Sequence, residues 1–200
     1  NREKVAGLLQ FSTTQSEGLS QDQSLKDYIS RMSSEQDKIY YLVADSLNAG
    51  KTSPHLEIFK KKGIEVILMY DRIDEWLMSH LREFDGKQFQ DIVRGELDLG
   101  GLEDVEEKKL QEESEKALEG LTGRIKTVLG DRVSEVRLTH RLTDSAACLA
   151  IGEDDMGAQM RKIMEASGQS LPESSPNYEL NPKHGLIEKL NDEQDEEHFE

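Results

Sequence analysis

The first half of the chain alternates short apolar runs with charged, helix-forming stretches, which predicts a small α/β module. Residues 39–44 are β-branched, aromatic and aliphatic, and residues 64–70 form a nearly continuous apolar run. Both runs are typical of buried strands. Between them, Ser53 and Pro54 supply a helix cap followed by a proline at the first helical position, and Gly63 supplies a stop. Strand, helix and strand in this order predict a βαβ unit with two parallel strands.

Two more helices are predicted in this half. Ser24, followed three residues later by Asp27, is a carboxylate variant of the capping box and starts a short helix that ends near residue 32. The polar stretch 12–23 before it has no periodicity, which predicts a loop. Across residues 71–84, apolar and ring-bearing side chains recur every three or four positions, as in an amphipathic helix. They are Ile73, Trp76, Leu77, His80, Leu81 and Phe84.

The composition changes at the glycine pair 100–101, and a long helix is predicted beyond it. Residues 103–119 are acidic and rich in good helix formers, so we expect this half of the helix to be solvated. An apolar stripe begins at Leu118 and continues until Gly130, which ends the helix.

The remainder predicts a second module. Residues 133–142 and 146–151 have the composition of strands, and the three polar residues between them predict a β-hairpin. Residues 154–166 predict a short amphipathic helix after it. The chain is therefore divided into residues 1–101 and 102–200. The fold class is α/β, or α+β overall: a parallel βαβ module, a long helix, and a module with a β-hairpin and flanking helices.

Charge and cysteine usage narrow the classes of function. The formal net charge is −16, from 25 Lys and Arg against 41 Asp and Glu, which disfavours nucleic acid as a partner. No apolar run approaches the roughly 20 residues that a membrane-spanning helix needs, so no membrane partner is expected. The single cysteine, Cys148, excludes an intramolecular disulfide. It lies in an apolar run, which predicts a buried core thiol in a reducing, cytoplasmic location.

Sequence motifs give little sign of catalysis. Neither common glycine-rich phosphate loop occurs, and the five histidines lack the spacing of zinc ligands. Asp71 and Asp74 follow a predicted strand, where catalytic groups often lie in α/β folds. The same pattern suits helix capping, with Asp71 as the cap and Asp74 and Glu75 at the positive end of the helix. Capping is favoured, so no catalytic, cofactor-binding or metal-binding residue is predicted, and an α/β enzyme that uses Asp71 and Asp74 is an alternative.

The helix predicted over residues 154–166 is rich in methionine. Met156, Met160, Ile163 and Met164 fall at positions i, i+4, i+7 and i+8, which places them in one stripe. Flexible thioethers adapt to irregular partners, so such a stripe suits promiscuous binding. By spacing alone, a stripe that faces the core is the more frequent arrangement.

Several runs, which follow the family's order along nearly the whole chain, resemble the bacterial ninety-kilodalton heat-shock chaperones. The runs are SLKDYISRM at residues 24–32, KIYY at 38–41, SPHLE at 53–57, KKGIEV at 61–66, DRIDEW at 71–76 and VRLTHRLTD at 136–144. The resemblance implies that residues 1–101 are the later part of the family's middle domain. Residues 102–200 then correspond to most of the C-terminal domain, without the final dimerisation helices.

The resemblance also implies a function. Members of this family are ATP-driven, cytoplasmic, homodimeric chaperones that remodel unfolded or partly folded client proteins. Their ATP and Mg²⁺ bind in an N-terminal domain, so no cofactor is expected within these residues.

The same resemblance assigns client-binding residues. The family's matching helix exposes its apolar stripe to clients, which implies client contact by Met156, Met160, Ile163 and Met164. Trp76 matches a position that is also implicated in client contact, with anchoring of its own helix on the sheet as the alternative. The alternative function is a structural scaffold or dimerisation piece without a client surface.

Overall fold

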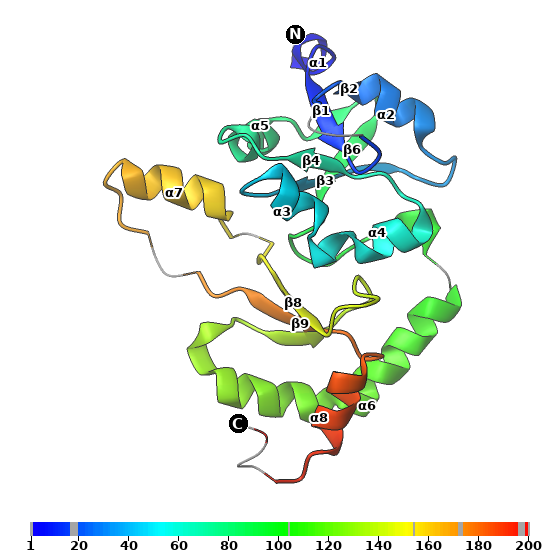
Figure 1. The fold of residues 1–200 in the computed structure, drawn as a ribbon, viewed down its shortest axis with the longest axis vertical. Helices are drawn as coiled ribbons and strands as arrows, with labels where there is room; N and C mark the ends of the chain where they lie inside the picture. The colour runs from blue at the N-terminus through cyan, green and yellow to red at the C-terminus, as the bar shows by residue number, and fades with distance from the viewer. Residues whose placement is uncertain are drawn as a thin grey trace.

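A mixed six-stranded sheet organises the first half of the chain in the computed structural model (Figure 1). The structure describes residues 2–16, 20–103, 105–153, 155–171, 174–195 and 199. The order of strands in the sheet is β2-β1-β4-β3-β6-β5. The strands are β1 (Gln10–Thr13), β2 (Gln23–Ser24), β3 (Lys38–Val43), β4 (Ile67–Met69), β5 (Glu83–Phe84) and β6 (Lys87–Asp91).

The predicted βαβ unit is confirmed at the centre of this sheet. Strands β3 and β4 pair in parallel, with Leu42 opposite Leu68. Their connection contains α3 (Leu47–Lys51), the 3-10 helix η1 (Pro54–Leu56) and α4 (Glu57–Lys62). The Ser53 hydroxyl accepts a hydrogen bond from the His55 backbone, and Gly63 ends α4 with a φ of +67°, a conformation that favours glycine.

Alternate residues of the central strands enter two different cores. In β3, Tyr40 and Leu42 pack with Phe59 on one face, while Ile39 packs with Tyr28 on the other. This alternation follows from the period of two along a strand. The second core is covered by α1 (Arg2–Ala6), α2 (Leu25–Arg31) and α5 (Asp74–His80). The capping box of α2 is confirmed: the Asp27 backbone donates to the Ser24 hydroxyl, and the Ser24 backbone donates to the Asp27 carboxylate.

Two predictions in this half are wrong in part, and one strand was not predicted. The stretch 12–23 is not entirely a loop, because β1 and β2 begin and end it. The polar side chains Ser12 and Thr13 are buried in β1, where the Ser12 hydroxyl donates to the Ser20 carbonyl. Helix α5 is shorter than predicted, and Phe84 belongs to β5. Polar β6 has no sequence signal of its own, and its place comes from parallel pairing with β3.

The second module begins with the predicted long helix, α6 (Val105–Leu129), which the 3-10 helix η3 (Gly130–Arg132) follows. In its acidic half, the described side chains of Lys109, Glu113, Glu115, Lys116 and Glu119 are exposed, as a solvated half requires. The apolar stripe of α6 packs on a three-stranded sheet of β7 (Val136–Leu138), β8 (Ala147–Ala150) and β9 (Asn177–Leu180).

The fold class is confirmed, but the predicted hairpin between residues 133–142 and 146–151 is wrong. The sheet order is β7-β9-β8, so β9 lies between the two strands that were expected to pair. It runs parallel to β7 and antiparallel to β8. The chain leaves β8, forms α7 (Ala158–Ala166) outside the sheet, and returns as β9 before α8 (Gly185–Asp192).

The two modules meet through a buried guanidinium. The Arg141 side chain is 1% exposed and its Nε lies 2.8 Å from Oε2 of Glu179, which is equally buried. The same guanidinium donates to the carbonyls of Ile92 and Gly95 in the first module, each at 2.7 Å. A charge from the second module therefore satisfies two backbone acceptors of the first.

A neutral histidine completes this contact. His55 Nε2 lies 3.0 Å from the Leu149 carbonyl, which can only accept, so Nδ1 is left to accept from Arg141 at 3.3 Å. Burial, and next the nearby Arg141 charge, lower the pKa of His55 to about 4. The ring is therefore uncharged at neutral pH.

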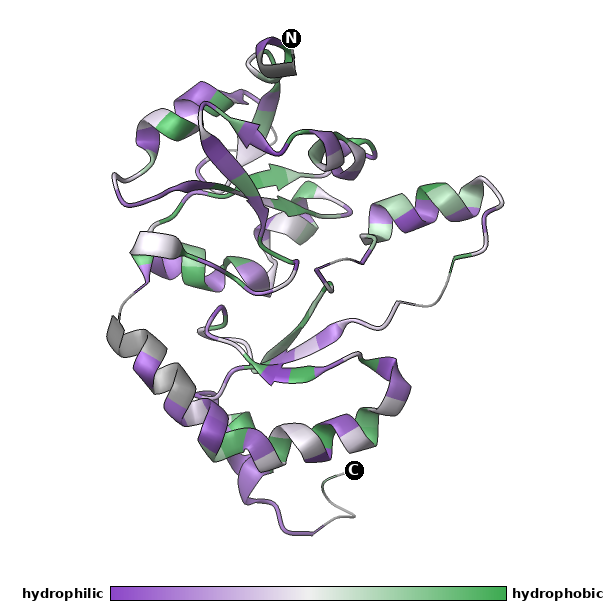
Figure 2. Ribbon diagram, turned by 180° about the vertical axis from the view of Figure 1, so that it is seen from behind, coloured by the Kyte–Doolittle hydropathy of each residue, from purple (hydrophilic) through white to green (hydrophobic). Residues whose placement is uncertain are grey.

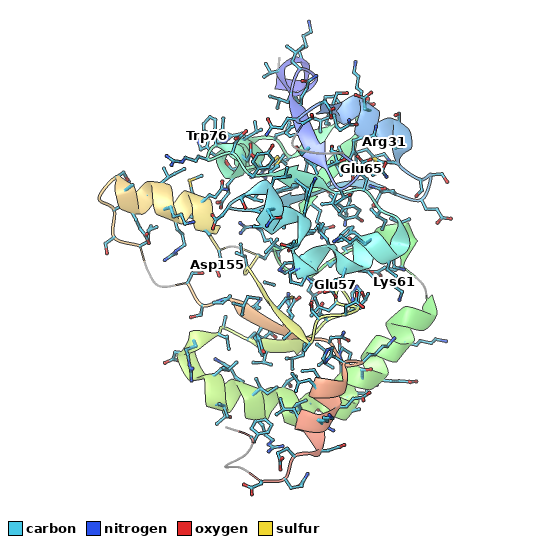
Figure 3. All side chains as sticks on the ribbon, viewed as in Figure 1. Arg31, Glu57, Lys61, Glu65, Trp76 and Asp155 are labelled. Carbon is cyan, nitrogen blue, oxygen red and sulfur yellow. The ribbon has the colours of Figure 1, made fainter. Side chains whose placement is uncertain are left out.

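Backbone and carboxylate contacts extend the junction on both sides of Arg141. Ile151 donates to the Val93 carbonyl, and Gly95 donates to the Ile151 carbonyl, each at 2.9 Å, so the end of β8 pairs with the chain that follows β6. On the other side, Glu57 accepts from the backbone of residues 143–145 (Figure 3). The sheets are thus held together by oriented polar groups.

We expect Arg141→Ala to lower the free energy of unfolding by about 2–4 kcal/mol. The change leaves the buried Ile92 carbonyl without its guanidinium donor, and it removes one of the two arginines that pair with buried Glu179, the other being Arg137. Chemical denaturation measures the loss. The matched control is Lys162→Ala, which removes an ion pair with Asp45 whose side chains are 63% and 67% exposed. That change should cost less than about 1 kcal/mol. Equal losses in the two variants would contradict the structural role of Arg141.

Candidate functional site

Helix α7 carries most of the predicted site, and no residue of this helix is buried. Ile163 is 44% exposed, and Met160 and Met164 are half-buried. Apolar positions therefore lie along a helix that stands outside both sheets (Figure 2). Met156 does not belong to the helix as predicted, because α7 begins after Gly157; it lies half-buried in the chain that enters the helix. Asp154, the predicted first residue, lies outside the described residues.

Trp76 lies on the outer face of α5 and does not anchor that helix. Its side chain is 56% exposed, and its ring lies 4.6 Å from the His80 ring, measured between centroids (Figure 3). Met78 and Leu81, each 7% exposed, fix α5 in the core below. The Trp76 ring is therefore exposed, and other residues hold α5 against the core.

Trp76 also borders an apolar groove that sequence reasoning missed. The groove has a volume of about 450 Å³ and lies between α1 and α5. Val5 is 59% exposed on its other wall, and Leu8, next to the groove in sequence, is 82% exposed. The lining residues are Val5, Ala6, Leu9, Trp76, Leu77, His80 and Leu81. The helical spacing of Val5 and Leu9 was the available signal, but nothing local places α1 beside α5.

The structure brings α5 and α7 together although they are about eighty residues apart. The Met160 backbone donates to Oε2 of Glu75 at 2.8 Å, and the Gln159 side chain donates to the Ala44 carbonyl at 2.9 Å. Both acceptors belong to the first module. The predicted residues Trp76, Met160, Ile163 and Met164 therefore lie on two neighbouring helices.

The aspartates proposed for the enzyme alternative form a structural turn. Asp74 Oδ2 accepts from the Asp71 backbone at 2.8 Å, so the carboxylate that holds the start of α5 belongs to Asp74 and not, as predicted, to Asp71. Burial, partly opposed by the Asp71 backbone hydrogen bond, raises the pKa of Asp74. Asp71 is exposed and accepts from Gln21 at 3.3 Å. Asp71 and Asp74 are therefore not arranged as a nucleophile and its base.

Cys148 is a core thiol, as predicted. It is 7% exposed, and burial raises its pKa to about 12, which keeps it protonated. Within the described ranges, no three His, Cys, Asp or Glu side chains are grouped so that they could hold a metal ion. No helix in the part of the chain that the structure describes is long and apolar enough to cross a bilayer.

We expect Trp76→Ala to lower the free energy of unfolding by less than about 1 kcal/mol, because the ring is largely solvated. Met78→Ala, two positions along the same helix, should cost about 2–5 kcal/mol, because it empties a core position. Thermal or chemical unfolding of both variants makes the comparison. A loss for Trp76→Ala as large as that for Met78→Ala would show that the tryptophan is a core anchor.

The amino-acid sequence of this chain is similar to that of known chaperones. The family model described as Hsp90 protein matches residues 1–200. The chain is 59% identical over 199 residues to the chaperone protein HtpG of Pseudoalteromonas translucida (strain TAC 125). The match covers 100% of this chain and 31% of that relative, so the chain spans about a third of the relative's length.

Proposed function

Because the chain belongs to the Hsp90 family of heat-shock chaperones, we propose that its exposed helices α5 and α7 bind client proteins for a molecular chaperone. The clients are unfolded or partly folded polypeptides, since these expose the apolar side chains that such a surface can cover. Residues 1–101 would supply part of the middle domain, and residues 102–200 most of the C-terminal domain.

The observation that carries the proposal is the exposure of Trp76 and Ile163 on adjacent helices. Each large apolar side chain gains roughly 1.5–3 kcal/mol when it is fully buried. A partner that covers several of them can therefore bind even after the cost of ordering is subtracted. Exposed apolar side chains that gather on one face of a soluble protein usually mark a binding site. A scaffold without a client surface has no comparable reason to leave Trp76 uncovered.

The methionines suit the variety of unfolded clients. Met160 and Met164 each have three rotatable side-chain bonds and a polarisable sulfur, so they adapt to differently shaped apolar groups. The groove beside Trp76 offers a second apolar contact at the other side of α5. An extended client segment would thus meet an adaptable surface on α7 and a ring and groove on α5.

We further propose that the whole protein is a cytoplasmic homodimer that uses ATP and Mg²⁺ through a part outside these residues. This part of the proposal rests on family resemblance. It implies that the present chain binds clients without nucleotide.

The test is the double variant Met160→Ser and Met164→Ser. Because no residue of α7 is buried, we expect the melting temperature to change by less than about 3 °C. Affinity for a permanently unfolded protein, such as reduced carboxymethylated α-lactalbumin, should fall about tenfold, as loss of two apolar contacts implies.

The matched control is Leu186→Ser, which removes an apolar side chain that is 58% exposed on α8, a helix that packs beside α6 and away from α7 (Figure 1). It should leave client affinity unchanged. If the double variant binds the unfolded protein as well as the wild type does, or if it unfolds, the proposed client surface is wrong.

A further inference from the structure

Helix α7 has no apolar anchor of its own. It belongs by sequence to the second module, yet it lies against the first, and none of its residues is buried. Its ion pair between Lys162 and Asp45 is solvated on both sides and contributes little. Two hydrogen bonds that fix α7 to the first module are made at its first turn, by Gln159 and Met160.

The first of these contacts is a helix cap supplied by another helix. Gly157 is the N-cap residue of α7 and has no side chain to accept from the free backbone N–H groups of the first turn. Glu75 of α5 accepts from the Met160 N–H, which is one of those groups, at 2.8 Å. Its negative charge also lies at the positive end of the helix dipole.

Gly157 makes this cap possible. A Cβ at residue 157 would lie 2.2 Å from Oε1 of Glu75 and 2.6 Å from its Cδ. The backbone of Gly157 has φ −70° and ψ 166°, which any residue can adopt. A side chain at residue 157 is therefore excluded by the Glu75 carboxylate, and not by the backbone conformation of Gly157.

Arg94 holds the chain that enters α7 at the same place. Its Nη1 donates to the carbonyls of Gly152 and Glu153 at 3.4 and 3.3 Å, and to that of Asp155. Its other nitrogens lie 3.9 Å from Glu75 Oε1 and 3.7 Å from Asp91 Oδ2. Arg94 thus connects the entry segment to the carboxylate that caps the helix.

We propose that Glu75, seated over Gly157 and held by Arg94, is a latch that docks α7 on α5 and so regulates the client surface. Glu75 precedes Trp76 directly, so the turn of α5 that carries the exposed ring also fixes the start of the methionine stripe. When the latch is closed, both apolar groups belong to one surface. When it opens, α7 moves independently and the surface is divided.

The effect on binding follows from the populations of the two arrangements. A client that needs both helices binds the docked form, and its apparent affinity falls in proportion to the docked fraction. Because α7 is held by few contacts, local undocking should occur without unfolding of either module. The inference rests on the proposed client function, and the two are separated by measuring α7 directly.

Two variants test the latch, one in each of the two helices' contact residues. Glu75→Ala removes the carboxylate, and Gly157→Ala fills the space that it occupies. Each should speed hydrogen exchange at the Met160 amide about fivefold, the size expected for loss of one cap. Affinity for reduced carboxymethylated α-lactalbumin should fall about threefold or more, by the population argument. Glu75→Gln, which keeps an acceptor oxygen, should retain much of the wild-type protection.

The double variant of Glu75→Ala and Gly157→Ala makes the test specific. Without the carboxylate, the added methyl group at residue 157 has nothing to displace, so the double variant should be no worse than either single variant. The control is Gly123→Ala in α6, where an added Cβ meets no atom within 4 Å. It should change neither α7 exchange nor client affinity.

Three results would overturn the inference. Unchanged exchange at Met160 in both single variants would show that there is no latch. Faster exchange with unchanged client affinity would show that docking of α7 does not regulate binding. Additive losses in the double variant would show that the two residues act separately. A wild-type chain that does not bind the unfolded protein at all would instead overturn the proposed function and, with it, the client role of the latch.

Discussion

The buried guanidinium of Arg141 is the group on which the arrangement of the two modules depends. It donates to two backbone carbonyls of the first module, and its ion pair with Glu179 fixes it within the second. Another arrangement of the modules that kept these groups buried would cost about 1–3 kcal/mol for each carbonyl left without a donor. The junction is therefore made by hydrogen bonds and charged groups of fixed orientation. Each module has a separate apolar core of its own.

This rigid junction explains how helices from both modules can share one surface. Since β8 is paired at Ile151 with the chain after β6, the segment that leaves β8 starts at a fixed place beside the first module. Helix α7 then reaches α5 and takes its cap from Glu75. The fold thus presents apolar side chains on a weakly held helix, supported by a strongly held junction, which is suited to binding clients of varied shape.

Local physical signals made much of the fold predictable from the sequence. The capping box at Ser24, the stop at Gly63 and the apolar strand β3 depend on neighbours within a few residues. Contacts between distant segments were not predictable in this way. Strand β9 gives no local sign that it lies between β7 and β8, and polar β1 is buried only because β2 and β4 flank it. For the site, periodicity identified the stripe of α7, but the partnership of Glu75 with Gly157 depends on tertiary placement.

The central claim, that α7 and Trp76 form an exposed client surface, is tested most directly by methyl NMR of the methionines. Met156, Met160 and Met164 lie at the proposed surface, while Met69 and Met78 are 1% and 7% exposed in the core and serve as internal controls. On titration with an unfolded protein, the account predicts shifts or broadening at the three surface methyl groups and the Trp76 indole, with the two core methyl groups unchanged. Binding that leaves Met160 and Met164 unperturbed, or that perturbs Met69 and Met78 equally, would contradict it.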